Sequence, residues 1–265
     1  MAKVLVDDAL WELIEPHLPR SKPARTGRPR VPNRAALTGI IFVLQTGIPW
    51  EYLPQEMGCG SGVTCWRRLR DWHAAGAWKK IHRVLLEEFH QAGEIDWSRA
   101  VIDSSSLRAV KGAQTGPNPT DRARAGSKHH LLTDAAGTPL VATLTGANDH
   151  DVTQLLPLVD QIPKLRGRRG RPCFRPARLQ GDRAYASQAH EAALRQRHIQ
   201  PVLAQRGTEH GSGLGTTRWV VERTISWLHQ YRRLRVRYER RADVHEAFLT
   251  LGCILICCKI ALQVF

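Results

Sequence analysis

The sequence predicts a mixed α/β fold, in which a small all-helical domain over residues 1–95 precedes a mixed sheet with flanking helices over residues 96–265. The first observation behind this prediction is a change in periodicity. Apolar residues recur at the spacing of helices before residues 93–98 and at the spacing of strands after them. The other observations are two strand-like runs that each lead to an acidic residue, and a helical segment that carries a third.

The first part is expected to contain four helices, each with an apolar stripe, at residues 8–18, 34–47, 63–76 and 77–93. The first three helices have side-chain caps available in Asp7, Asn33 and Ser61. The third is predicted to bury Val63, Trp66 and Leu69. Because it is basic and another helix follows it, the arrangement indicates a helix-turn-helix-like module that binds DNA.

The charge of the chain favours a polyanionic partner. Lys and Arg outnumber Asp and Glu by 39 to 24, which gives a formal net charge of +15, and nucleic acid fits best. In the third helix, Arg67, Arg68 and Arg70 are expected to contact phosphates or base edges, and the alternative is a solvated charged face. The Pro- and Gly-rich segment around Arg28 and Arg30 is either an exposed connector or an arm along a DNA backbone or minor groove.

The sequence is not expected to be that of a membrane protein or of a disulfide-bonded protein. The longest apolar run, Phe248 to Leu262, is too short to span a bilayer, and the N-terminus has no signal-peptide pattern, so we expect a cytoplasmic, nucleoid-associated protein. The six cysteines lack CxxC spacing and are expected to be buried, reduced thiols. The weaker alternative is a zinc site formed by Cys59, Cys65, His73 and His82.

The second part is expected to mix strands and helices. Strands are predicted at residues 99–103, 129–133, 140–145, 179–182 and 198–204, with the second and third forming a hairpin. Helices are predicted at residues 152–163, 187–198, 218–228 and 244–262, the first of them capped by Asp151. Polar, basic or Gly-rich loops are expected at residues 108–128, 164–178 and 206–217.

Three acids fall in the order strand, strand, helix. Asp103 ends the run RAVID, Asp182 ends RLQGD, and Glu222 lies in TTRWVVERTISWL. A single Asp after a strand is usually a turn or cap residue. The evidence for a metal site is therefore the order of all three acids, and not any one of them. Hard cations such as Mg²⁺ take oxygen ligands, and two of them clamp the attacking and leaving oxygens of a phosphodiester. This arrangement of acids predicts a ribonuclease-H-like fold for the second part.

Nearly the whole chain resembles the insertion-sequence-five family of DDE transposases. The resemblance rests on GRPR, LQTGIPWEYLP, CWRRLRDWHAAGAW, AVIDSSSLRAVKGA, GSKHHLLTDAAGTPL, GDRAY and RWVVERTISWL with its Arg-rich tail. It implies that Asp103, Asp182 and Glu222 are the catalytic and metal-binding triad, with two Mg²⁺ ions that Mn²⁺ can replace. It also implies double-stranded DNA as partner, as terminal inverted repeats and as target, and a homodimer assembled on that DNA.

Family signatures around the glutamate run Tyr, two residues, Arg, three residues, Glu, six residues, Lys. Arg218 and Glu222 match, and their spacing of four residues allows an ion pair that either orients the carboxylate or is a surface pair. The Lys position is occupied by His229 and the Tyr position by Gly215. Phosphate binding is then expected from one of two arginines close by, Arg232 or Arg233.

The implied reaction is hydrolysis at the end of the element to leave a 3′-hydroxyl, which then attacks target DNA in line. Two alternatives remain open at this point. One is a metal-dependent nuclease on the same fold that never joins DNA, and the other is a catalytically silent DNA-binding regulator.

Overall fold

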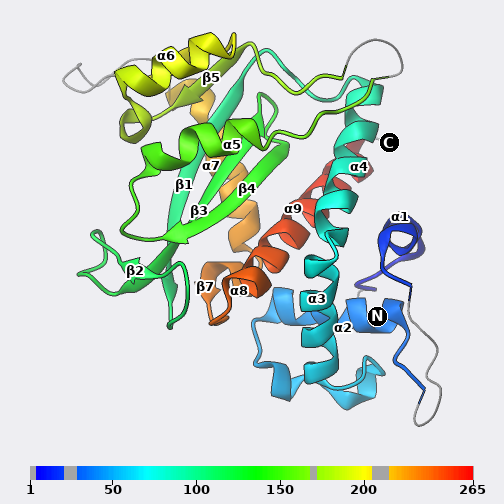
Figure 1. Cartoon of the computed structure of the whole chain (residues 1–265). Coiled ribbons are helices and arrows are strands. Elements are labelled where there is room, and N and C mark those ends of the chain that lie inside the picture. The colour runs from blue at the N-terminus through cyan, green and yellow to red at the C-terminus, as the bar shows by residue number, and fades with distance from the viewer. Residues whose placement is uncertain (1–3, 21–28, 168–171, 205–214, 265) are drawn as a thin grey trace.

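The computed structural model describes residues 4–20, 29–167, 172–204 and 215–264 (Figure 1). The N-terminal part is helical and contains α1 (Asp8–Ile14), η1 (Glu15–His17), α2 (Asn33–Thr46), η2 (Trp50–Tyr52), η3 (Gln55–Met57), α3 (Gly62–Ala74) and α4 (Ala77–Ala92). All four predicted helices are present, although the first ends its α-helical portion at Ile14 because Pro16 follows.

Local capping chemistry agrees with the prediction at two of the three helix starts. Asp7 accepts a hydrogen bond from the Leu10 amide, and Ser61 accepts one from the Thr64 amide. The prediction for Asn33 was wrong, because Pro32 is the residue that precedes the first turn and Asn33 is already helical. Proline fits there since it supplies extended backbone before the helix without needing a side-chain bond.

The prediction that Val63 is buried was also wrong. Val63 is 55% exposed, while Cys65, Leu69 and Trp72 form the buried stripe of α3 and Trp66 is partly buried. The buried stripe therefore runs through residues 65, 69 and 72, which follow helical spacing, and Val63 lies off it.

The second part holds the sheet. Its strands are β1 (Ala100–Ala109), β2 (Gly116–Pro117), β3 (Ala125–Asp134), β4 (Pro139–Gly146), β5 (Arg178–Gly181), β6 (Gln200–Leu203) and β7 (Val236–Arg237). Its helices are η4 (Asp151–Gln154), α5 (Leu155–Asp160), η5 (Arg183–Tyr185), α6 (Gln188–Gln196), α7 (Gly215–His229), α8 (Arg232–Arg235) and α9 (Ala242–Val264). The predicted loop at residues 206–217 lies mostly outside the described residues.

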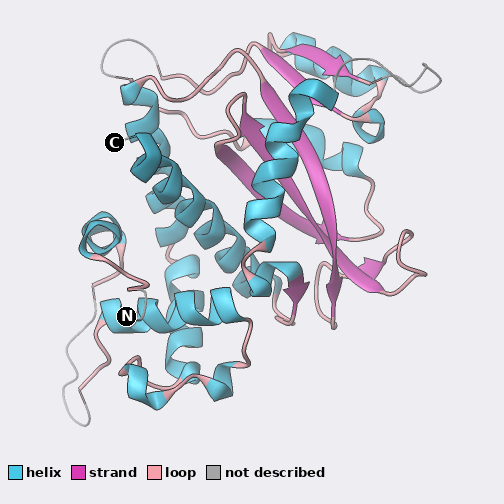
Figure 2. Cartoon of the chain, turned by 180° about the vertical axis from the view of Figure 1, so that it is seen from behind, coloured by secondary structure: helices cyan, strands magenta, loops and turns pink. Residues whose placement is uncertain are grey.

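The order of the five main strands across the sheet is β4-β3-β1-β5-β6. The strand β3 runs antiparallel to both β4 and β1, whereas β5 and β6 run parallel to β1. Helix α7 crosses one face of the sheet, as Figure 2 shows, and α5 covers the other face in Figure 1. Three antiparallel strands followed by two parallel ones, with helices on both faces, form the ribonuclease-H-like fold that the sequence predicts.

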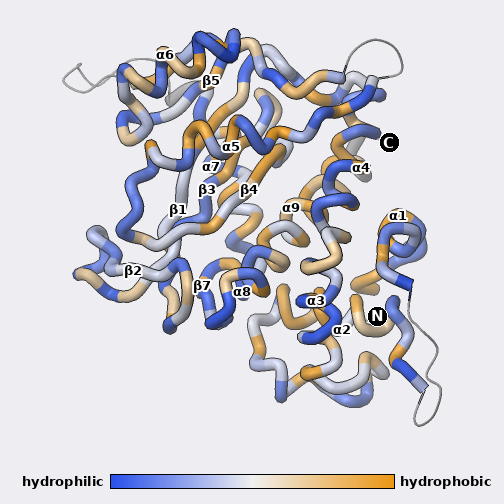
Figure 3. Tube along the Cα trace, viewed as in Figure 1, coloured by the Kyte–Doolittle hydropathy of each residue, from blue (hydrophilic) through white to orange (hydrophobic). Residues whose placement is uncertain are grey.

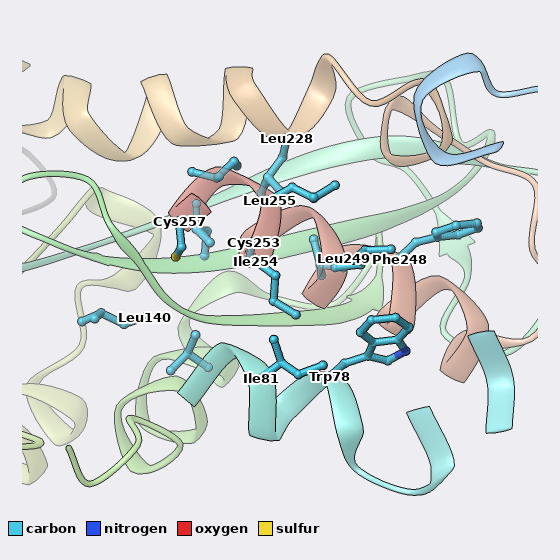
Figure 4. Packing of buried hydrophobic residues seen from close by; sticks show 14 of the residues in the cluster. Trp78, Ile81, Leu140, Leu228, Phe248, Leu249, Cys253, Ile254, Leu255 and Cys257 are labelled. Atoms are coloured by element: carbon cyan, nitrogen blue, oxygen red, sulfur yellow. The ribbon is translucent and has the colours of Figure 1, made fainter. Parts of the chain in front are cut away.

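Helix α9 is the shared core element. It is apolar on all sides, which is typical of a buried helix, and Figure 3 shows hydrophobic residues along it. It packs against α3 and α4 on one side and against β4 and α7 on the other. In Figure 4, Trp78 and Ile81 of α4 face Phe248, Leu249 and Ile254 of α9. Full burial of each such side chain stabilises the fold by roughly 1.5–3 kcal/mol.

The apolar run Phe248–Leu262 is part of a longer helix, α9. Residues 242–261 of α9 form a helix long and apolar enough to do so, and it is the one such span in the described part of the chain. Two thirds of that window, 67%, is buried against the protein's own helices and sheet. We therefore assign α9 to the core.

Helix α2 also contacts α8 directly, through a glycine. Gly47 ends α2 with φ of 74°, a left-handed conformation that favours glycine. A Cβ atom at this position would lie 2.8 Å from Cβ of Arg232. The N-terminal helices and the C-terminal segment are thus in close contact and share one hydrophobic cluster. The division into domains at residue 95 stays a prediction.

Candidate active site

Two of the predicted acids lie side by side on parallel strands. Val101 of β1 pairs with Gln180 of β5, so Asp103 and Asp182, each two residues further on, occupy equivalent places at the same edge. Neighbouring strands are about 4.8 Å apart, which brings the two carboxylates close to each other. Asp182 also accepts a hydrogen bond from the Ala184 amide at 2.9 Å, which fixes it as the cap of η5.

The expectation that the first strand stops at its acid was wrong. Asp103 lies inside β1, which continues to Ala109, whereas Asp182 directly follows β5 as expected. The polar residues after Asp103 stay in the strand because β3 pairs with them as far as Arg108. Tertiary pairing here overrides the local preference of serines for turns.

The Asp103 carboxylate is largely buried and has few compensating donors. Burial, together with the nearby charge of Asp182, raises its pKa above the ordinary aspartate value. The Ser104 amide donates to Oδ1 at 2.8 Å and Arg218 donates to Oδ2 at 3.3 Å, and both lower the pKa in part. The site therefore retains negative charge that a further cation would stabilise.

Arg218 joins the third acid to the first. It lies on α7, which packs on β1, and its Nη2 is 3.3 Å from Asp103 and 3.6 Å from Oε1 of Glu222. The Glu222 side chain is 59% exposed, so this pair is open to solvent. Arg218 thus contacts the carboxylates of Asp103 and Glu222 through a single nitrogen, while Asp182 follows the strand that pairs with the Asp103 strand.

The three acids fit divalent metal ions by their chemistry, because Asp103, Asp182 and Glu222 offer the hard oxygen donors that Mg²⁺ takes. A guanidinium already stands between two of them, which marks this place as one where positive charge is stabilised. Within the described residues, no three acidic, His or Cys side chains are close enough to hold an ion as they stand. Arg218 or Glu222 would have to change rotamer for an ion to bind.

A groove of about 540 Å³ leads away from Glu222 along α7. It is lined by Ser105 and by α7 residues on one face, and it ends at Arg232 and Arg235 of α8. Both arginines are exposed. Arg232, which was predicted to bind phosphate, therefore lines a groove. Arg235, which sequence reasoning missed, is three residues further along the chain and lies on the same face of the helical turn.

Arg233 points the other way. Its side chain is 4% exposed, it pairs with Glu239 at 3.1 Å, and it donates to the carbonyl of Ile48. Tyr238 covers its guanidinium from a distance of 5.1 Å to the ring centroid. Arg233 therefore belongs to the contact between α8 and the N-terminal helices and has no free face toward the groove.

His229, which occupies the signature Lys position, lines the groove as a neutral ring. Burial, and then the charge of Arg235, lowers its pKa below the ordinary histidine value. Its Nε2 lies 3.5 Å from Oγ of Ser105, the residue two places after Asp103 on the same face of β1. Positive charge at this end of the groove comes from the arginines of α8.

The predicted DNA-binding arginines of the N-terminal part are differently placed. Arg28 lies outside the described residues, and Arg30 and Arg67 are exposed. Arg68 donates to the Val31 carbonyl at 3.4 Å, and Arg70 pairs with its neighbour Asp71. Arg30 and Arg67 thus have the most freedom to meet a phosphate, while Arg68 and Arg70 have internal partners.

The other face of β1 carries a polar cluster that sequence reasoning missed. Asp151 was predicted as a helix cap, and that was wrong: it is the first residue of η4 and caps nothing. Its carboxylate instead accepts from Oγ of Ser104 at 2.9 Å and pairs with Lys128 at 3.0 Å. The cluster fastens η4 to the strand that holds Asp103. No local signal predicts it because the partners are up to 47 residues apart.

The alternative zinc site is not formed. Cys59 and Cys65 are buried together, but His82 instead contacts the carbonyl of Pro139 and His73 lies near Glu246. Burial raises the pKa of Cys65 to about 12, so its thiol stays protonated. All six cysteines are free, and the prediction of burial is correct for four of them, whereas Cys173 and Cys258 are partly exposed.

Comparison with known proteins assigns families to both parts. Residues 6–82 match a family described as putative transposases of the IS4/5 family, and residues 95–258 match the transposase DDE domain. A putative transposase for insertion sequence element IS402 of Burkholderia cepacia is 65% identical over 159 residues, which is 60% of this chain and 74% of that protein. An uncharacterized 16.2 kDa protein of the same element is 61% identical over 123 residues, covering 45% of this chain and 84% of its own length.

Solved structures are more distant. A simian T-cell lymphotropic virus intasome matches 59% of this chain and 48% of its own with 16% identity and a TM-score of 0.37. The catalytic domain of the Mos1 mariner transposase matches 72% of this chain and 94% of its own with 8% identity and a TM-score of 0.27. The fold assignment accordingly rests on the strand order and on the family match.

Proposed function

The chain belongs to the IS4/5 family of DDE transposases, and from that premise we propose that it binds the terminal inverted repeats of its element, cleaves at the element ends and joins them to target DNA. Two observations support this proposal: Arg218 joins Glu222 to Asp103 beside the strand that leads to Asp182, and a groove lined by Glu222 ends in exposed arginines. DNA is the substrate to which such a groove and a net charge of +15 are suited.

In this proposal the three acids hold two Mg²⁺ ions, which Mn²⁺ can replace. When bound, the ions supply charge neutralisation at the reacting phosphate. The chain's own residues do the rest. Arg232 and Arg235 bind phosphates of the strand in the groove, and Arg218 orients the carboxylates of Asp103 and Glu222.

The proposed reaction has two phosphoryl transfers. Water first attacks the phosphodiester at the element end. A P–O bond to the water oxygen forms as the bond from phosphorus to the 3′-oxygen breaks, which leaves a 3′-hydroxyl and a 5′-phosphate. The 3′-oxygen then attacks a target phosphodiester, forming one P–O bond as another breaks, so bond number is conserved in the joining step. No covalent bond to the protein is needed, since catalysis comes from positioning and charge stabilisation.

The test is incubation of the purified protein with its own flanking inverted-repeat DNA and Mg²⁺, followed by separation of nicked and joined strands. Replacing Asp182→Asn should lower cleavage by a factor of about 100 or more while DNA affinity is kept. Asp160→Asn, in an exposed pair with Arg197, is the matched control. Undiminished cleavage by Asp182→Asn would reject the assignment of the acids.

The same assay separates the alternative functions. Cleavage without joining to a target would instead support a nuclease on this fold. DNA binding without any cleavage in Mg²⁺ or Mn²⁺ would support a regulator.

We also propose that the N-terminal helices form the predicted helix-turn-helix-like module and recognise the terminal repeats, with the exposed Arg30 and Arg67 as its DNA-contacting cations. Two element ends must be held together for joining, so the assembly on DNA is proposed to be a homodimer in the cytoplasm, at the nucleoid. Mass measurement of the protein with and without end DNA checks this. A single copy per pair of ends would contradict it.

A further inference from the structure

The two aspartates of the candidate active site lie just beyond the stretch where their strands are paired. The last residue pair between β1 and β5 is Val101 with Gln180. Asp103 and Asp182 lie two residues further on, and β5 has ended at Gly181 by then. A metal site needs its ligands within about 0.5 Å of their working positions. A contact other than the pairing of these strands is therefore needed to set the distance between the two aspartates.

The polar cluster on the other face of β1 reaches the strand directly after the first aspartate. Ser104 donates from Oγ to Oδ1 of Asp151 at 2.9 Å. Lys128 reaches the same oxygen at 3.0 Å, and the ring of His130 lies 3.9 Å from it. Ser104 is opposite His130 in the pairing of β1 with β3, so their side chains share one face of the sheet. Successive residues of a strand point to opposite faces, so Asp151 acts on Asp103 only through the strand.

Asp151 also lies next to the turn that holds the second aspartate. It is the first residue of η4, and η4 contacts η5, whose cap is Asp182. Tyr185, the last residue of η5, is buried. Burial raises the pKa of Tyr185, and the nearby charges of Asp151, Asp103 and Asp182 raise it further. The Tyr185 hydroxyl is therefore close to all three carboxylates, and η4 contacts the strand of one aspartate and the turn of the other.

The cluster is withdrawn from solvent, which holds it in one arrangement. The side chains of Lys128 and Asp151 are 11% and 18% exposed, and His130 is fully buried. Burial lowers the pKa of His130 to about 4, so its ring is neutral near pH 7 and Lys128 is the cation that pairs with Asp151. Lys128 also donates to the carbonyl of Asp149 at 2.8 Å, which fixes the chain just before η4.

From these contacts we propose that Asp151 is a positioning residue: it ties Ser104 to η4, which contacts η5, and so sets the spacing of Asp103 and Asp182. This inference rests on the proposed function, because it presumes that the two aspartates share metal ions. Residues that orient metal ligands are worth about 10–100-fold in metal affinity or activity. Loss of the Asp151 carboxylate releases β1 from η4, and the distance between the two aspartates is then no longer fixed.

The test measures Mn²⁺ binding to the purified full chain, without DNA, from the electron paramagnetic resonance signal of the free ion. Asp151→Ala should raise the Mn²⁺ concentration at half-saturation about tenfold or more. Ser104→Ala, which removes one hydroxyl, should raise it a few-fold. Ser106→Ala is the matched control and should leave it unchanged, since Ser106 is on the same face of β1 but is exposed.

Cleavage of end DNA by the same proteins is then followed over a range of Mg²⁺ concentrations. Asp151→Ala should move the midpoint of the Mg²⁺ curve upward, while affinity for end DNA in EDTA stays unchanged. A cluster that only stabilised the fold would lower the melting temperature and the maximal cleavage, and it would move neither the Mn²⁺ nor the Mg²⁺ midpoint.

Unchanged midpoints for both ions in Asp151→Ala would overturn the inference. Should that variant fail to fold, Ser104→Ala decides by the same criterion. Asp182→Asn is the reference, because it removes a proposed metal ligand and should weaken Mn²⁺ binding most. If Asp182→Asn bound Mn²⁺ as the wild type does, the ions would lie elsewhere, and the assignment of the three acids would fall together with this inference.

Discussion

Two regions of this molecule use the same polar residues in opposite ways. At the contact between the N-terminal helices and the sheet, Arg233 and Glu239 form an ion pair in which each side chain is 4% exposed. At the candidate active site, Arg218 and Glu222 form a pair in which the side chains are 20% and 59% exposed. Burial makes the first pair a structural element, while exposure leaves the second free to exchange a guanidinium for another cation.

The neighbours of the two acids also differ. Burial raises the pKa of Glu239, but nearby His245 and the charge of Arg233 outweigh it, so the pKa lies below the ordinary glutamate value. Asp103 in the groove has a raised pKa because its burial is not outweighed. The two carboxylates thus differ in how far neighbouring donors and charges offset the effect of their burial.

The largest expected effect is at the buried pair. Glu239→Ala leaves the buried Arg233 without its carboxylate, so the free energy of unfolding should fall by about 3–5 kcal/mol. Urea unfolding followed by circular dichroism measures it. Glu222→Ala, in the exposed pair, should change stability by no more than about 0.5 kcal/mol. Equal losses from the two variants would remove the distinction between the regions.

A second buried contact, made by His82, is expected to make the stability of the protein depend on pH. His82 of α4 is buried and its Nε2 lies 2.9 Å from the carbonyl of Pro139, so it joins the helices to the sheet. Burial lowers its pKa to about 4 from 6.5. The unfolded chain is protonated first as pH falls, so stability is full above pH 6.5 and is lost between pH 6.5 and 4, by about 3 kcal/mol.

The check is urea unfolding at a series of pH values. His82→Gln keeps a donor for the Pro139 carbonyl but cannot titrate, so its stability should depend on pH less steeply by about one proton. His130, whose pKa burial also lowers to about 4, is present in both proteins and cancels in the difference. Identical slopes for wild type and variant would show that His82 is not the group lost with acid.

In the groove, replacing a glutamate is expected to change the rate of DNA cleavage and not the stability of the fold. Glu222→Gln keeps size and hydrogen bonding but removes the charge, so cleavage of end DNA should fall by a factor of about 100 or more with an unchanged melting temperature. Gel separation of cleaved strands and a thermal melt give the two readings. Glu12→Gln, at an exposed position on α1, is the control. If Glu222→Gln lowered the melting temperature as much as Glu239→Ala is expected to, the exposed and buried glutamates would not differ in their role.

The smallest expected effect is at the far end of the groove. Arg232→Ala should weaken binding of end DNA a few-fold and reduce the slope of log affinity against log salt by about one, because one phosphate contact is lost. Arg235→Ala should behave alike, and Arg195→Ala on α6, outside the groove, should not. Unchanged salt slopes for both groove variants would place the DNA elsewhere.

Much of this fold is readable from the sequence because its determinants are local. The periodicity of α3, α4 and α7, the hairpin of β3 and β4, and the caps at Asp7 and Ser61 depend on residues a few places apart. The order of the three acids is local as well, in that each is set by its own strand or helix.

The misreadings have a common cause in distant partners. Asp103 lies inside a strand because β3 pairs with the serines after it, and Asp151 binds Lys128 and Ser104 in place of a helix end. Arg233 turns inward to a glutamate and to the Ile48 carbonyl, 185 residues away in the sequence. None of these pairings leaves a trace in the spacing of neighbouring residues.

The position of α9 has a consequence for biosynthesis. Trp78 and Ile81 of α4 and the apolar face of β4 are covered by residues 242–264, which leave the ribosome after all the elements that they cover. Until then the apolar surfaces of α4 and of β4 are both exposed on the nascent chain, because α9 covers both. Release of α9 completes both at once, so the helices and the sheet reach their folded state in the same late step.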